Sequence, residues 1–236
     1  VDLALAGVAF LDRVRAAGHE IASHGHTHTP LFDLDPASFR EELRRSAAAI
    51  EDATGVIPRG FRAPNFSITR KTAWAFDVLR EEGVQYDSSV FPVRTPMYGV
   101  SGAPVVPYRL RGEAPFTARD AARPTRGLVE LPAAVFHPRV RLPVAGGFYA
   151  RLLPARVLAR GIRNLNSRGV PATLYFHPWE FNPGVAVDCL PLHKRFVSFH
   201  GIDRLSEKLR DLLAAFRFDA AEAVVASYRE ETREGD

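Results

Sequence analysis

The stretch that decides the fold is GHEIASHGHTH, residues 18–28, in which a short apolar run ends in a cluster of histidines. The part HEIAS is typical of a short strand, so the cluster follows directly at its carboxyl end. His24 and His28 are four positions apart. Imidazole is a common neutral metal ligand, and two at this spacing on a tight loop or helical turn predict a metal site. The alternative is a turn carrying surface histidines, because short histidine patterns often occur without metal.

The same arrangement recurs at three later points of the chain. Three ionisable residues each follow a short candidate strand: Arg62 after PRGF, Asp87 after VQY and His177 after ATLYF. In parallel α/β folds the active site forms from loops at the carboxyl ends of the strands. We therefore predict that these three side chains and the histidine pair belong to one site.

Each of the three also has a purely structural interpretation. Arg62 could pair with a carboxylate at the end of the sheet, and Asp87 could cap a turn through the serines that follow it. His177, which precedes Pro-Trp, could be a packed and hydrogen-bonded histidine. Their shared position after separate strands favours the functional interpretation.

Helix signals alternate with these strands along the chain. Asp35 and Pro36 are typical of an N-cap and a first helical position, and Gly55 is a typical stop. Thr69 is a typical cap for the next helix. Alternating strands and helices predict an α/β fold with a parallel sheet or barrel. The expected helices are 36–54, 70–82, 154–169 and 203–216, after a helix end at 8–14, and the expected strands are 18–23, 58–63, 84–89, 127–133 and 171–177.

Composition narrows the class of protein. The 236 residues are 46% hydrophobic and 25% charged, which suits one globular domain spanning residues 1–236. The single Cys189 excludes an internal disulfide framework and a cysteine zinc cluster. Apolar runs are too short for a membrane-spanning helix. The net charge of +4 comes from arginines interspersed with acidic residues and accompanies no nucleic-acid-binding motif, so we expect no nucleic-acid partner.

Four motifs together resemble carbohydrate esterase family four, the polysaccharide deacetylases. SHGHTH resembles that family's H-[S/T]-x-x-H metal motif, and FRAPNFSIT (61–69) resembles its R-x-P motif. YDSS (86–89) resembles its aspartate motif, and TLYFHPWEF (173–181) its last histidine motif. With PVAGGFYARLLP (143–154), the run is most similar to a bacterial subgroup linked to exopolysaccharide loci, which carries an extra C-terminal region, here about 185–236.

The resemblance implies a distorted (β/α) barrel that hydrolyses N-acetyl groups of a polysaccharide. It also implies that His24 and His28 ligate a divalent metal, most often zinc. Such an ion polarises the acetyl carbonyl and acidifies a bound water.

The resemblance assigns roles to the other residues as well. It makes His177 the general acid that protonates the leaving amine. Arg62 is then expected to orient the catalytic base, and Asp87 to hold and tune His177. Three residues are expected to wall the acetyl pocket: Pro64, Phe66 and Trp179.

The chain departs from the family pattern at its start. The family's first motif, a T-F-D-type strand end, supplies the catalytic base and the aspartate metal ligand. Only 23 residues precede His24, and their acidic residues are Asp2, Asp12 and Glu20, none in a strand of this type. We therefore expect the first strand–helix–strand unit of the barrel, and with it a third metal ligand, to be missing. A fragment of a longer protein or a partner chain that supplies the motif would explain this.

Two other functions stay open at this point. One is a non-catalytic glycan-binding or scaffold protein that keeps the cleft but has no base. The other is a hydrolase of a small cyclic amide or formamide on the same fold.

The Pro-, Gly- and Arg-rich stretch 92–126 is expected to be an irregular excursion or lid. No signal-peptide pattern occurs at the start, and both a cytoplasmic and a periplasmic location are compatible with the sequence.

Overall fold

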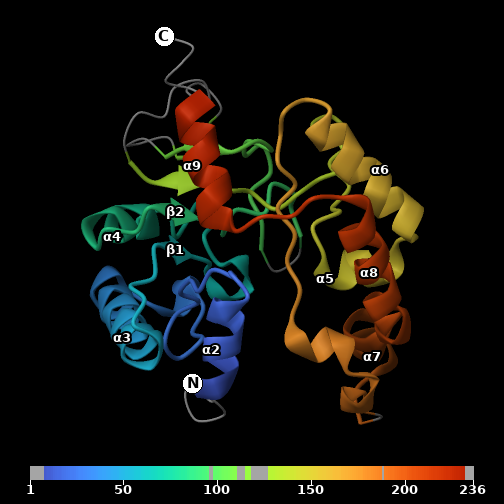
Figure 1. Cartoon of the computed structure of the whole chain (residues 1–236), viewed down its shortest axis with the longest axis horizontal. Helices are drawn as coiled ribbons and strands as arrows, with labels where there is room; N and C mark the ends of the chain where they lie inside the picture. The colour runs from blue at the N-terminus through green and yellow to red at the C-terminus, as the bar shows by residue number, and fades with distance from the viewer. Residues whose placement is uncertain (1–7, 96–97, 111–114, 118–126, 188, 232–236) are drawn as a thin grey trace. The chain divides into compact units, whose positions relative to one another are not determined.

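The structure is a computed structural model that describes residues 8–95, 98–110, 115–117, 127–187 and 189–231 (Figure 1). The chain divides into two compact units: unit 1 comprises residues 1–132 with 219–236, and unit 2 comprises residues 133–218. The expectation of one domain over 1–236, with a C-terminal region from about 185, stays a prediction.

Unit 1 is built on a small, mainly parallel sheet in the order β1-β2-β4-β3. The first three strands run parallel, and β3 is antiparallel to β4. An isolated parallel bridge joins Ser23 to Phe61, so the expected strand 18–23 is reduced to one bridging residue. Together with Asp87 and Glu130, these residues form one continuous register across four chain segments. The strands are β1 (Gly60–Phe61), β2 (Tyr86–Asp87), β3 (Tyr108–Arg109) and β4 (Val129–Glu130).

One helix of unit 1 begins and ends at its predicted capping residues, whereas the next begins later than predicted. The Asp35 side chain accepts a hydrogen bond from Ser38 N, and Gly55 closes the same helix in the left-handed conformation, as predicted. The next helix begins at Ala75 rather than after Thr69, because Thr72 bonds back to Ser67 O and holds the chain in turns. The helices are α2 (Val8–Ala16), α3 (Pro36–Thr54), α4 (Ala75–Glu81) and α9 (Ala221–Glu231), with short 3-10 turns η1 (Leu31–Asp33) and η2 (Pro64–Phe66).

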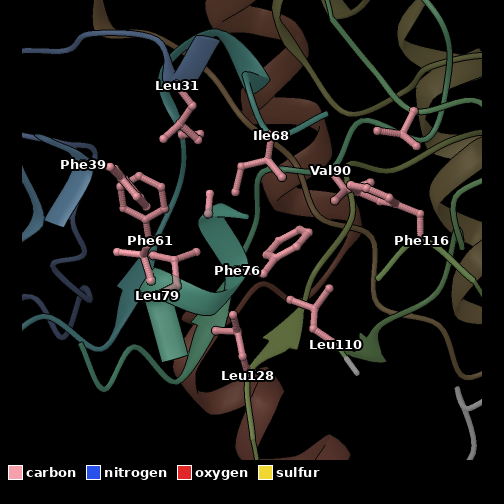
Figure 2. Close-up of a cluster of buried hydrophobic side chains, with 14 of the residues drawn as sticks. Leu31, Phe39, Phe61, Ile68, Phe76, Leu79, Val90, Leu110, Phe116 and Leu128 are labelled. Carbon is pink, nitrogen blue, oxygen red and sulfur yellow. The ribbon is translucent and has the colours of Figure 1, made fainter. Parts of the chain in front are cut away.

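The main core of unit 1 lies between the sheet and the helices α3 and α4 (Figure 2). Phe39 from α3 packs edge-on against Phe61 of β1 and against Trp74. A second cluster forms where Val225 of α9 packs with Tyr86 of β2, Val129 of β4 and Leu131. Burial of this apolar surface is the main stabilising contribution to the unit.

The C-terminal helix α9 is tied to the N-terminal half by polar contacts as well. Glu20 accepts hydrogen bonds from the Tyr86 hydroxyl and from Glu222 N, the latter at 2.8 Å. Arg59 forms an ion pair with the Glu222 side chain at 2.5 Å. Helix α9 is therefore a structural part of unit 1, although 86 residues of unit 2 separate it from the rest of that unit in the sequence.

Unit 2 combines helices with parallel bridges. The expected strand 171–177 forms isolated bridges at Thr173 and Tyr175, paired with Ala133 and Gly146. Gly146 has a φ of 140°, and a Cβ there would lie 1.8 Å from the Tyr175 carbonyl oxygen, so this close pairing requires glycine. The elements are α5 (Gly147–Leu152), α6 (Ala155–Asn166), η4 (Pro178–Phe181), η5 (Pro183–Val185), α7 (Leu192–Phe199), η6 (Ile202–Arg204) and α8 (Leu205–Ala215).

These elements confirm the α/β class, with α6 and α8 lying inside the helices expected at 154–169 and 203–216. The excursion 92–126 falls partly outside the described residues. Its described part supplies Val100, Tyr108 and Leu110 to the buried core. The expectation that the excursion is a lid stays a prediction. Among the helices that the structure describes, none combines the length and the apolar character needed to cross a membrane.

Candidate functional site

The histidine loop, residues 24–28, begins directly after the Ser23 bridge at the edge of the sheet. His24 Nδ1 lies 2.6 Å from the Arg62 carbonyl oxygen, which can only accept, so Nδ1 carries the proton and Nε2 is the nitrogen able to ligate. The rings of His24 and His28 meet edge to face, with centroids 4.9 Å apart and an interplanar angle of 75°. Gly25 and His28 both have a positive φ, and this backbone folds the loop so that the two imidazoles meet.

Glu42 of α3 holds this loop in place. Its Oε2 accepts hydrogen bonds from His26 N at 2.9 Å and from Thr27 N at 2.7 Å. Burial alone would raise the pKa of Glu42, but these two backbone donors outweigh burial and lower it. Sequence reasoning missed Glu42, because nothing in a charged helix face distinguishes this carboxylate from its neighbour Glu41.

The histidine pair fits a divalent metal as two of its ligands. Both rings are close enough to contact one ion, and the carbonyl partner of His24 is the kind of second contact that orients a metal-bound imidazole. Within the described part of the chain, no group of three or more His, Cys, Asp or Glu side chains forms a metal site. The described donors therefore account for two ligands.

Arg62 is fixed at the same edge of the sheet. Its Nε donates to the Ser88 carbonyl oxygen at 2.9 Å, and its Nη2 donates to Ser88 Oγ at 2.7 Å. The guanidinium also lies 5.9 Å from the centre of the Phe66 ring. This anchoring leaves a positive charge at the carboxyl ends of β1 and β2.

The R-A-P-N-F segment after β1 carries backbone strain. Asn65 and Phe66 have φ values of 55° and 48°. With His28, they are the residues other than glycine with a positive φ among those described. Conformations of this kind cost energy and cluster at functional sites, so their location supports a site at this edge.

Asp87 and Glu130 form a buried carboxyl pair. They occupy paired positions on β2 and β4, and neither has exposed surface. Asp87 accepts hydrogen bonds from the hydroxyl and backbone N–H of Ser89, so it also makes the turn that the structural interpretation expected. Glu130 Oε1 accepts from Val90 N at 2.9 Å, whereas no donor among the described residues reaches Oε2.

Burial and mutual repulsion disfavour the ionisation of both carboxyls at once. Burial raises the pKa of both carboxyls, and the nearby charge of Asp87 holds the pKa of Glu130 well above its ordinary range. Asp87 already receives two hydrogen bonds from Ser89, and Arg62 lies near, so its ionised form is the better stabilised. A protonated Glu130 then donates to Asp87. Sequence reasoning missed Glu130, although it lies in the predicted strand 127–133.

His177 lies in unit 2, at the end of the segment bridged through Thr173 and Tyr175. Its Nδ1 is 3.2 Å from Glu180 Oε2, and its backbone N–H donates to the same oxygen at 2.9 Å. The Trp179 ring stacks on the imidazole, with 5.9 Å between centroids and 28° between planes. Sequence reasoning missed Glu180, whose only signal was its position three residues after His177.

The structure therefore brings the predicted residues together in two groups. His24, His28, Arg62 and Asp87 lie at the carboxyl edge of the sheet in unit 1. Pro64 and Phe66 are buried in the same unit. His177 and Trp179 lie together in unit 2. A contact between Asp87 and His177, and a common pocket wall, stay predictions.

Comparison with known proteins gives two family matches. Residues 7–86 match the polysaccharide deacetylase model, and residues 88–226 match a domain of unknown function, DUF3473. The peptidoglycan deacetylase-like protein FGM2 of Gibberella zeae is 31% identical over 119 residues, which are 50% of this chain and 34% of that protein. The peptidoglycan deacetylase of Helicobacter pylori is 31% identical over 74 residues, which are 31% of this chain and 24% of that protein.

A solved structure supports the same fold. The crystal structure titled putative polysaccharide deacetylase from Mycobacterium smegmatis matches with a TM-score of 0.53 and 23% identity, over 94% of this chain and 66% of that one. The match confirms the deacetylase-type barrel fold. The aligned segments span only about a third and a quarter of the two curated relatives. With the DUF3473 match covering more than half of the chain and the deacetylase match covering the segment before it, this chain belongs to the polysaccharide deacetylase family, in the group that carries a DUF3473 domain.

Proposed function

We propose that this chain belongs to a metal-dependent hydrolase that removes N-acetyl groups from a bacterial exopolysaccharide. The observation that carries the proposal is the His24–His28 pair, oriented by the Arg62 carbonyl oxygen at the carboxyl edge of the sheet. Paired imidazoles at this edge suit zinc, and zinc supplies a polarised carbonyl and an acidified water when bound.

The remaining residues suit acid-base chemistry around such an ion. Arg62, anchored through Ser88, is proposed to orient the catalytic base. His177 is proposed to donate a proton to the leaving amine. Pro64, Phe66 and Trp179 are proposed to surround the acetyl methyl group.

The substrate class follows from family membership. The two curated relatives carry the name peptidoglycan deacetylase or peptidoglycan deacetylase-like protein, which supports a glycan as the substrate. The narrower proposal of an exopolysaccharide rests on the resemblance of the motif series to the exopolysaccharide-linked subgroup. An N-acetylglucosamine polymer and peptidoglycan present the same acetamide, so the test must include both.

The test is acetate release by the purified chain with Zn²⁺, Co²⁺, Ni²⁺ or EDTA. The probes are an N-acetylglucosamine polymer, chitooligosaccharides, peptidoglycan and a small cyclic amide. We expect metal-dependent acetate release from at least one glycan and loss of release in His24→Ala/His28→Ala. Glycan binding without acetate release under every metal condition would replace this proposal with a non-catalytic binding function. Turnover of the cyclic amide alone would replace it with an amide hydrolase.

A further inference from the structure

A buried ion pair lies directly behind His177. Arg151 Nε donates to Glu180 Oε1 at 2.9 Å, and the two side chains are 3% and 1% exposed. The other carboxylate oxygen, Oε2, faces His177 Nδ1 and accepts from the His177 backbone N–H. The three side chains therefore form a linear series of contacts, from the Arg151 guanidinium through the Glu180 carboxylate to the His177 imidazole.

The carboxylate is held rigidly because Arg151 is held rigidly. Arg151 Nη1 donates to the Ser198 and His200 carbonyl oxygens at 2.6 Å and 3.2 Å, and Nη2 donates to the Val197 oxygen at 3.0 Å. These acceptors belong to the last turn of α7 and its C-cap. A guanidinium bound in this forked manner has little freedom to rotate, so Glu180 is fixed with it.

Glu180 Oε2 acts as a hydrogen-bond acceptor where it faces the His177 ring. Burial works to raise the pKa of Glu180, but its bonds to His177 and Arg151 outweigh burial and lower it, so the carboxylate is ionised. The Glu180 backbone N–H donates to the His177 carbonyl oxygen at 3.0 Å. A ring nitrogen facing an acceptor-only oxygen must carry hydrogen.

We propose that Glu180 is a positioning residue that holds His177 in the Nδ1–H tautomer and orients Nε2 for proton exchange with substrate. The orienting role rests on the proposed function, because it presumes that His177 is the general acid. The tautomer itself depends only on the geometry within unit 2. The same carboxylate also fixes the backbone of His177, so it controls both the position and the protonated nitrogen of the ring.

The first test uses the unmodified chain and needs no activity. Long-range ¹H–¹⁵N correlation spectra of the histidine rings, assigned with His177→Gln, identify the nitrogen that bears the proton when the ring is neutral. We expect Nδ1–H for His177. A neutral His177 that carries its proton mainly on Nε2 would overturn the proposal, whatever the chain's activity.

The second test removes the acceptor without leaving a buried charge. Removing one partner of a buried ion pair is strongly destabilising, whereas replacing both with apolar residues is often tolerated. Glu180→Leu combined with Arg151→Met is therefore the main variant, Glu180→Gln keeps an acceptor oxygen, and Glu207→Gln is an exposed control. We expect the Nδ1–H preference to disappear in the double variant and to persist in the Glu207 control. Persistence in the double variant would show that Glu180 does not set the tautomer.

Kinetics separate this proposal from the proposed function. If the unmodified chain releases acetate, we expect the double variant to lose kcat by about 10²-fold with KM little changed, because the impaired step is proton transfer and not substrate binding. An unchanged kcat would remove Glu180 from the mechanism. If the unmodified chain releases no acetate, the proposed function fails while the spectra still decide the tautomer.

Discussion

Asp87 on β2 and Glu130 on β4 occupy paired positions of parallel strands and share a site with no exposed surface. Two ionised carboxylates at this distance in a dry interior would repel each other strongly, and each would also lose its hydration. We expect Glu130 to keep its proton, because burial and the nearby charge of Asp87 both raise its pKa. This arrangement makes the stability of the fold depend on pH.

We expect Glu130→Gln to remove that dependence. The folded-state pKa of Glu130 lies above the unfolded value of about 4.3, so the folded chain holds a proton that the unfolded chain releases. The stabilisation is complete below the unfolded pKa, and the free energy of unfolding falls by up to about 1.4 kcal/mol per pH unit as the pH rises toward the folded pKa. Glutamine keeps a donor for Asp87 and does not titrate.

Urea unfolding between about pH 5 and pH 8 measures this effect. The free energy of unfolding should decline more steeply with pH in the unmodified chain than in Glu130→Gln. Glu51→Gln, at an exposed position of α3, serves as the control and should keep the steeper decline. Equal slopes in all three proteins would mean that Glu130 is ionised in the folded state.

We expect His24→Ala/His28→Ala to abolish zinc uptake. Both imidazoles of the proposed pair are lost, and the described residues offer no group of three ligands elsewhere. Elemental analysis after dialysis, together with calorimetric titration of Zn²⁺, measures the change. His19→Ala is the matched control. A double variant that retains one zinc per chain would place the metal site elsewhere.

We expect Glu42→Ala to weaken zinc binding by about 10-fold to 100-fold without removing either ligand, as is usual when a supporting contact of a metal ligand is lost. The two N–H groups of the loop lose their acceptor, at a cost of about 1 kcal/mol because water can reach Thr27. Calorimetric titration of Zn²⁺ measures the affinity, and Glu41→Ala on the same helix is the control. Unchanged affinity in Glu42→Ala would show that the loop needs no support from α3.

We expect Arg151→Ala to lower the free energy of unfolding by about 3–5 kcal/mol, because it leaves the Glu180 carboxylate buried without its partner. The carbonyl oxygens at the end of α7 lose their donor in the same variant. Thermal and urea unfolding measure the loss. Arg156→Ala, on α6, is the control for removal of one arginine. A loss below about 1 kcal/mol would mean that water replaces the guanidinium.

We expect Asp35→Ala to lower the free energy of unfolding by about 1 kcal/mol, because the Ser38 N–H at the start of α3 loses its acceptor. Asp35→Asn keeps an acceptor oxygen and should recover most of the loss. Urea unfolding measures both variants. Equal losses in alanine and asparagine would assign the effect to charge near the helix terminus instead of to the hydrogen bond.

The elements that sequence analysis predicted well are those controlled by local chemistry. The N-cap at Asp35, the stop at Gly55, and the positions of Arg62 after β1 and Asp87 at the end of β2 all depend on neighbouring residues in the chain. The start of α4 was wrong, because the contact from Thr72 to Ser67 replaces the expected cap at Thr69. Short side-chain bonds of this kind compete with helix formation and are difficult to rank from sequence alone.

The supporting carboxylates were missed for a different reason. Glu42 contacts the histidine loop but follows it by 14 residues in the sequence, and Glu130 pairs with Asp87 across a separation of 43 residues. A glutamate in a strand or on a helix carries no local sign of what faces it. The histidine, arginine and aspartate positions were found because they follow strands, whereas the residues that hold them depend on strand register and helix packing.

The attachment of α9 to unit 1 has a consequence for how the protein is synthesised. Residues 219–231 cover β2 and β4, yet they leave the ribosome after all of unit 2. During translation the apolar surface at Tyr86 and Val129 therefore stays uncovered by α9 until the 86 residues of unit 2 have been synthesised. Exposed apolar surface of this kind promotes association with other nascent chains. Release of the last helix, not of the histidine loop, is the event that completes the fold of unit 1.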